Sequence, residues 1–194
     1  MLLGVAGMVG SGKSTLARAP ASRFGLQLAL ESVDLENPWL EAFYASPDSM
    51  RAYALHLQLH FLATRFASMR RMRGLGGSWV LDRTWYEDAE VFAAGLHEQG
   101  LLSSDEWVLY KRLYAELLHA PAARPPRLLI YLHAPLETIL ARIAERGRIK
   151  EREVDLDRHL QREPGVVRGR LEQVDHRADR ALGRHRLQVE HLIV

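Results

Sequence analysis

A glycine-rich segment near the start of the chain has the composition of a phosphate-binding loop. Gly7, Gly12, Lys13 and Ser14 fit the pattern G-x-x-x-x-G-K-[ST]. The glycines allow backbone turns that aim N–H groups at phosphate oxygens, and the N-terminus of the following helix adds a favourable dipole. Lys13 would neutralise charge on the β- and γ-phosphates, and Ser14 would bind Mg²⁺. The alternative is a glycine-rich turn that binds no nucleotide. We expect a nucleoside triphosphate to bind here.

Charged residues follow the next two apolar segments. Glu31 ends one segment, and Asp82 and Arg83 end the other. A carboxylate beside a triphosphate suits a general base that accepts a hydroxyl proton during phosphoryl transfer. Asp82 would hold Mg²⁺ through water, and Arg83 would contact both the base and the phosphates. The alternatives are an exposed glutamate at a strand end and a structural ion pair between neighbours.

Short apolar runs alternate with helical patterns along the chain. We expect strands at residues 2–6, 26–30, 79–81, 128–132 and 187–194. We expect helices at residues 14–24, 38–44, 50–73, 86–96, 105–118 and 135–146, and a weaker one around 155–182. Continuous apolar strands between helices predict an α/β fold with a parallel sheet covered on both faces. Ligands bind at the carboxyl ends of such strands, which is where the charged residues and the glycine loop are predicted.

Composition limits the class of protein further. The chain has 194 residues, which suits one domain. It has no cysteine, which excludes disulfides, thiol nucleophiles and iron–sulfur clusters. No apolar run reaches the length of a membrane-spanning helix, so we expect a cytoplasmic protein without a membrane partner. The net charge of +2 is too small to predict nucleic-acid binding, and the arginines after residue 161 are interpreted as a solvated surface.

Six segments, in this order, resemble the deoxynucleoside kinases, and are closest to the bacterial deoxyadenosine/deoxyguanosine kinases. They are GMVGSGKST, LES, NPWLEAFY, ALHLQLHFLATRF, DRT-YEDAEVFA and IYLHAPLETILARIAERGR, within about residues 2–160. The resemblance implies a P-loop kinase fold: a five-stranded parallel sheet with helices on both faces and an arginine-rich lid at about 142–153, in a single domain over 1–194. It also implies a homodimer that acts in deoxynucleotide salvage.

The resemblance implies transfer of the γ-phosphate of ATP, with Mg²⁺, to the 5′-hydroxyl of a deoxynucleoside. Glu31 matches the general base, and Arg83 matches the arginine that positions this base and the phosphates. Lys13 completes the catalytic set, while Ser14 and Asp82 are the predicted metal ligands. The predicted ATP-binding loop residues are Gly7, Met8, Val9, Gly10, Ser11, Gly12, Lys13, Ser14 and Thr15.

The resemblance also implies a base pocket. Gln58 matches the glutamine at the edge of the base, Arg65 and Asp88 match a polar cluster beside it, and Phe92 matches the ring that stacks on the base. Asp88 favours an exocyclic amino group and Arg65 adds a donor, so thymine fits worst. We therefore predict purine deoxynucleosides as the best substrates, deoxycytidine second and thymidine poor. Taken singly, these side chains also fit ordinary helix-surface or core positions.

The sugar and phosphate contacts complete the implied site. Tyr44 and Glu151 match groups that hold the sugar 3′-hydroxyl. Arg142, Arg146 and Arg148 match the lid that closes over the phosphates. Local ion pairs with nearby glutamates are the alternative for these arginines.

The chain departs from the family pattern after about residue 161, where the family's last long helix is not recognisable. Two alternative functions stay open at this stage. A nucleoside monophosphate kinase such as thymidylate kinase shares the loop and the Asp-Arg pair, but acidic Glu31, Asp34 and Glu36 would repel its phosphorylated acceptor. A non-catalytic nucleotide-binding subunit would need neither the base nor the lid residues.

Overall fold

The computed structural model describes residues 1–30, 37–123, 125–146 and 188–193. It contains one parallel sheet with the strand order β2-β3-β1-β4-β5. The strands are β1 (Leu2–Gly7), β2 (Gln27–Ala29), β3 (Trp79–Asp82), β4 (Leu128–His133) and β5 (Gln188–Ile193). The predicted α/β class with a parallel sheet is confirmed. Strand β2 is shorter than expected, and the helix predicted around 155–182 lies outside the described residues.

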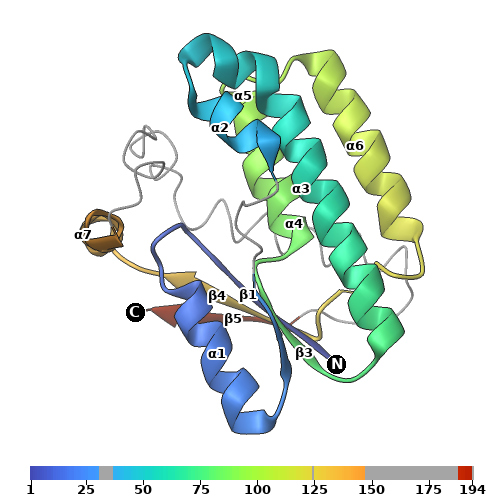
Figure 1. Cartoon of the computed structure of the whole chain (residues 1–194), viewed down its shortest axis with the longest axis vertical. Helices are drawn as coiled ribbons and strands as arrows, with labels where there is room; N and C mark the ends of the chain where they lie inside the picture. The colour runs from blue at the N-terminus through green and yellow to red at the C-terminus, as the bar shows by residue number, and fades with distance from the viewer. Residues whose placement is uncertain (31–36, 124, 147–187, 194) are drawn as a thin grey trace.

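Helices cover both faces of this sheet, as predicted (Figure 1). On one face, α1 (Lys13–Phe24) packs Ala17 and Ala21 against Val5 and Val80 of the central strands. The other face carries the larger core, built from α2 (Pro38–Tyr44), α3 (Pro47–Leu75), α4 (Trp85–Glu87), η1 (Asp88–Ala93), α5 (Ala94–Glu98) and α6 (Ser104–His119). Along β1, β3 and β4, apolar side chains alternate between the two faces because the strand period is two residues.

Helix α7 (Leu136–Arg146) lies apart from both cores (Figure 1). Its buried Ile139 and Ile143 pack against Met8 and Val9 of the glycine loop. Helix α7 therefore packs against the loop of the predicted phosphate site.

Helix α3 starts earlier than predicted. The Ser46 hydroxyl accepts a hydrogen bond from the Ser49 N–H at 3.1 Å, and Pro47 occupies the first helical position. Proline fits there because the N–H groups of the first helical turn have no acceptor within the helix, so the N–H that proline lacks is not needed. The resulting 29-residue helix carries Gln58 and Arg65 along the larger core.

The helix predicted over 86–96 is present, since the chain is helical from Trp85 to Glu98, but it is not one regular α-helix and consists of three parts. Helix α4 begins with a capping box between Thr84 and Glu87, and η1 is a π-helix that precedes α5. A π-helix widens the backbone turn and shifts the direction of the side chains that follow, and such segments are frequent at functional sites. Asp88 and Phe92 both lie on η1.

Within the described ranges, none of the helices has the length and the apolar run that crossing a membrane requires.

Candidate active site

The glycine loop between β1 and α1 requires glycine at defined positions. Gly7, Gly10 and Gly12 have φ values of 142°, 78° and 99°, which side chains rarely tolerate. A Cβ atom on Gly7 would lie 2.4 Å from the carbonyl oxygen of Leu132 on β4. The sequence pattern therefore corresponds to a backbone that turns sharply against the sheet.

Two cations lie against the backbone of this loop. The buried Lys13 Nζ donates to the Met8 carbonyl at 2.8 Å, and Arg142 Nη1 on α7 donates to the Ser11 carbonyl at 3.1 Å. The buried Ser11 hydroxyl oxygen has no hydrogen-bond partner among the described residues. Ser14 and Thr15 follow in the first turn of α1. The loop thus combines positive charge, an unsatisfied polar atom and a helix N-terminus, which together suit an anion such as a triphosphate.

The end of β3 brings Asp82 next to the glycine loop. Asp82 is paired in register with Val5 on β1, two residues before Gly7. It is 4% exposed, and its Oδ1 has no hydrogen-bond partner among the described residues. A buried carboxylate oxygen without a partner is costly unless a ligand, water or cation satisfies it. This orphaned oxygen fits the predicted Mg²⁺ role of Asp82.

Arg83 has an unusual backbone. Its φ of 75° is the one positive value among the non-glycine residues that the structure describes. Its guanidinium lies over the Phe92 ring, 4.6 Å from the centroid, and its Nη1 lies 3.9 Å from Glu87 Oε1. A left-handed arginine costs conformational energy, and such strain is concentrated at functional sites.

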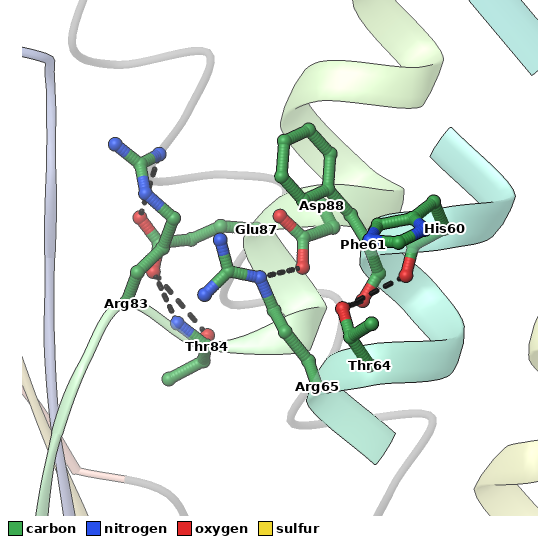
Figure 2. Close-up of polar contacts among 8 residues, drawn as sticks. All are labelled: His60, Phe61, Thr64, Arg65, Arg83, Thr84, Glu87 and Asp88. Carbon is green, nitrogen blue, oxygen red and sulfur yellow. Dashed lines mark hydrogen bonds and ion pairs between the residues drawn. The ribbon is translucent and has the colours of Figure 1, made fainter. Parts of the chain in front are cut away.

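Glu87 is a functional candidate that the sequence reasoning missed. Its Oε2 accepts from the Thr84 N–H at 2.8 Å, and its Oε1 accepts from the Gly7 N–H at 3.3 Å. Figure 2 shows this carboxylate between Arg83 and Thr84. Burial raises the pKa of Glu87, while Arg83, Lys13 and the two backbone N–H groups oppose the shift. The T-x-x-E spacing of residues 84–87 is the signal that was available in the sequence.

The predicted base pocket contains a buried ion pair. Arg65 Nε lies 2.5 Å from Asp88 Oδ2, and the Asp88 side chain is 2% exposed (Figure 2). The Arg65 guanidinium also lies 5.6 Å from the centroid of the Phe61 ring on the same helix. Gln58 on α3 is 3% exposed, and its Oε1 has no hydrogen-bond partner among the described residues. The structure therefore brings Arg65 and Asp88 together and leaves a buried amide oxygen on the same helix as Arg65.

Two other predicted residues are placed less directly. Phe92 supports the Arg83 guanidinium, so its ring belongs to the surroundings of the Asp-Arg segment, and its stacking on a base stays a prediction. Tyr44 ends α2 and meets the buried Phe43 ring edge-on, with the centroids 4.9 Å apart. Its contact with the sugar also stays a prediction.

Four predicted residues fall wholly or partly outside the description. Glu31, Arg148 and Glu151 lie outside the described residues, and Arg146 is described only as the last backbone position of α7. The roles of these four residues therefore stay predictions.

Comparisons with known proteins agree with the fold and the motifs. The family model for deoxynucleoside kinases matches residues 3–162. The deoxyadenosine/deoxycytidine kinase of Bacillus subtilis is 41% identical over 150 residues, which are 77% of this chain and 67% of that protein. The deoxyguanosine kinase of Lactobacillus acidophilus is 36% identical over 148 residues, which are 74% of this chain and 62% of that protein. This chain thus spans about two thirds or less of the length of these relatives.

A solved structure has a similar fold at low identity. The deoxyadenosine kinase of M. mycoides superposes with a TM-score of 0.72 at 20% identity, covering 100% of this chain and 90% of that one. The family match spans the glycine loop, the Asp-Arg segment and both helices that carry the buried ion pair. From its loop, its sheet and this match, the chain belongs to the deoxynucleoside kinase family.

Proposed function

We propose that this protein transfers the γ-phosphoryl group of ATP to the 5′-hydroxyl of a deoxynucleoside. We further propose that purine deoxynucleosides are the best acceptors, deoxycytidine is second and thymidine is poor. The single observation that carries the proposal is the buried Arg65–Asp88 ion pair, one residue from Glu87, which contacts the glycine loop. A polar recognition site for an acceptor and a phosphate-binding loop are thereby joined through consecutive residues.

The proposed base specificity follows from the polar groups of the pocket. Asp88 accepts hydrogen bonds and favours an exocyclic amino group, as on adenine or cytosine, while Arg65 is a hydrogen-bond donor and suits the carbonyl of guanine. Thymine would place a carbonyl and a methyl group against an acid. Unpaired buried polar groups are costly, so this mismatch lowers efficiency. The names of the two bacterial relatives include deoxyadenosine, deoxycytidine and deoxyguanosine, which supports these three as acceptors of this protein.

The proposed donor site uses the glycine loop. Backbone N–H groups of the loop would bind phosphate oxygens, and Lys13 would exchange its bond to the Met8 carbonyl for the β- and γ-phosphates. Arg142 lies close enough to the loop to contribute positive charge there. Arg146 and Arg148 are proposed to add to that charge in a lid over about 142–153.

The proposed acceptor chemistry depends on Glu31 and Arg83. Glu31 would accept the proton of the 5′-hydroxyl, and Arg83 would stabilise the charge that develops on the transferring group. Ser14 and the unpaired Oδ1 of Asp82 would hold Mg²⁺. When bound, Mg²⁺ would neutralise charge on the triphosphate. No group of three or more histidine, cysteine or acidic side chains gathers as a metal site in the described part of the chain, so the triphosphate itself would supply further ligands.

The experiment that tests this proposal is a comparison of acceptors. Phosphoryl transfer from ATP with Mg²⁺ would be measured for deoxyadenosine, deoxyguanosine, deoxycytidine, thymidine and thymidine monophosphate. We expect the first two to have the highest kcat/KM and thymidine the lowest of the four nucleosides. Higher efficiency with thymidine than with the other three would refute the role of the Arg65–Asp88 pair. Transfer only to thymidine monophosphate would identify a nucleoside monophosphate kinase.

The same protein would be used to test the general base. Glu31→Gln keeps the side-chain shape and removes the basic carboxylate, so we expect turnover to fall by roughly 10²-fold or more while ATP binding is kept. Unchanged turnover would remove Glu31 from that role. ATP binding without transfer to any acceptor would favour a non-catalytic nucleotide-binding subunit. Four further properties stay predictions: action in deoxynucleotide salvage, a cytoplasmic location, a homodimer and a single domain over 1–194.

A further inference from the structure

Glu87 is a buried carboxylate whose two oxygens serve two distant parts of the chain. Oε2 accepts from the Thr84 N–H at 2.8 Å and from the Thr84 hydroxyl at 3.4 Å, which caps α4. Oε1 accepts from the N–H of Gly7, the first glycine of the phosphate loop, 80 residues earlier in the sequence. One side chain therefore connects the end of β1 to the Asp-Arg segment after β3.

A second capping box in this chain shows what helix capping alone requires. At the start of α6, Glu106 Oε2 accepts from both the Ser103 N–H and the Ser103 hydroxyl at 2.7 Å. These bonds are local to the first turn of α6, and Glu106 is only partly buried. Capping thus needs one oxygen and no deep burial. The burial of Glu87 and its bond to Gly7 are not explained by capping.

Burying Glu87 costs free energy, because a carboxylate loses its hydration when it leaves water. Its surroundings offset this cost with positive charge and N–H donors. Arg83 Nη1 lies 3.9 Å from Oε1, and the attraction of Lys13 also favours the charged form. These two cations are the ones proposed to act on the transferring phosphoryl group. Glu87 is thus surrounded by the groups whose relative positions decide the geometry of transfer.

We infer that Glu87 is a positioning residue, which holds the first glycine of the phosphate loop and Arg83 at a fixed separation for phosphoryl transfer. The inference rests on the proposed function. Both oxygens of Glu87 already accept hydrogen bonds from the protein, so Glu87 acts through Gly7 and Arg83. The next residue, Asp88, binds Arg65, so the same turn also connects this junction to the base pocket (Figure 2).

The test compares Glu87→Gln with Glu106→Gln. A glutamine at position 87 has one acceptor oxygen, so its NH₂ group must face either the Gly7 N–H or the Thr84 N–H. Losing a buried charge-assisted hydrogen bond changes an equilibrium by roughly 10-fold or more. We expect E87Q to raise the Kd for ATP with Mg²⁺ by roughly 10-fold. We expect it to lower kcat by roughly 10-fold or more. We expect the KM for deoxyadenosine to change by less than about threefold, because the base pocket is kept.

The control variant keeps every contact of the loop. Glu106→Gln changes the same kind of cap, so we expect its kcat and its Kd for ATP to match those of the unchanged protein. Circular dichroism and the Tm of each variant would establish that both are folded. Equal losses in the two variants, or no loss in E87Q, would overturn the inference.

Two further measurements keep the inference testable in other circumstances. If the unchanged protein transfers phosphate to no deoxynucleoside, the proposed function fails, and the ATP Kd of E87Q against E106Q decides the role of Glu87 by itself. If E87Q does not fold, amide hydrogen exchange of the unchanged protein decides it. We expect the Gly7 N–H to be strongly protected by its bond to a buried acceptor, and rapid exchange at Gly7 would overturn the inference.

Discussion

Variants of the Arg65–Asp88 ion pair should change the free energy of unfolding and the kcat/KM for the deoxynucleoside in different ways. The two side chains are 14% and 2% exposed, so removing either one leaves a largely buried charge without its partner. Breaking a buried pair in this way costs about 3–5 kcal/mol. Because Arg65 retains some solvent contact, we expect the lower end, about 3 kcal/mol, for Arg65→Met and for Asp88→Leu alike. In a chain of this size this corresponds to a fall in Tm of roughly 6–12 °C.

The double variant should behave differently. With both charges absent, neither member of the pair is left as an isolated buried charge, and replacing a buried ion pair with apolar side chains is often neutral. We expect R65M/D88L to be no less stable than either single variant, so its cost falls at least about 3 kcal/mol short of the sum of the two. We expect kcat/KM with deoxyadenosine to stay reduced by roughly 10²-fold or more in all three variants, since the donors and acceptors for the base are lost.

Urea unfolding followed by tryptophan fluorescence would supply the free energies, and initial rates of phosphoryl transfer would supply kcat/KM. Arg70→Met is the matched control, because Arg70 is exposed on the same helix, and we expect it to change stability by less than about 0.5 kcal/mol. Additive destabilisation in the double variant would refute the energetic coupling of the pair. A double variant with full activity would refute its role in recognising the base.

Three further predictions concern the backbone and pH. Gly7→Ala should weaken ATP binding by roughly 10-fold or more, since its Cβ would lie 2.4 Å from a strand carbonyl oxygen. The control Gly25→Ala, at φ 62° with no atom within 4 Å, should cost only about 1 kcal/mol of stability and leave ATP binding unchanged. Equal ATP affinities for the two variants, measured by calorimetry, would contradict this prediction. Arg83→Gly should be more stable to urea than Arg83→Ala by about 1 kcal/mol, because both lose the guanidinium but only glycine adopts φ 75° without strain. Both variants should lack phosphoryl-transfer activity. Equal stability of the two variants would argue against backbone strain at this position. The pKa of Glu106 is lowered by its hydrogen bonds to Ser103, so its charged form stabilises the fold above the unfolded-state pKa. We expect this contribution to be lost as the pH falls from about 5 to about 3, measured as the difference in free energy of unfolding between the unchanged protein and E106Q. A difference that does not change with pH would contradict this prediction.

Several local features were predictable from the sequence because they depend on neighbouring residues. The glycine loop is recognisable since its backbone needs glycine at fixed spacing before a lysine and a serine. Helix α2 has the predicted bounds, because Asn37 caps its first turn and Pro38 suits its first position. The alternation of apolar runs and helical patterns was sufficient to predict the parallel sheet.

Other features depend on which strands become neighbours. The sequence places Gly7 and Glu87 80 residues apart, and only the pairing of β1 with β3 brings the two chain segments together. The unpaired oxygen of Asp82 likewise results from burial beside β1. Residue types at a given spacing do not specify these contacts, since burial and register arise when separate segments pack.

The sequence by itself determined the family, the phosphate-binding loop and the candidates Arg65, Asp88 and Arg83. The loop residues and Arg83 lie in short motifs whose residue types match one chemistry, whereas Arg65 and Asp88 were predicted from the resemblance to the family. Only the tertiary structure decided that Arg83 has a left-handed backbone and that the segment after Glu87 is a π-helix. It also decided that Glu87 connects the loop to the Asp-Arg segment, because a carboxylate finds its second hydrogen-bond donor only when the sheet has formed.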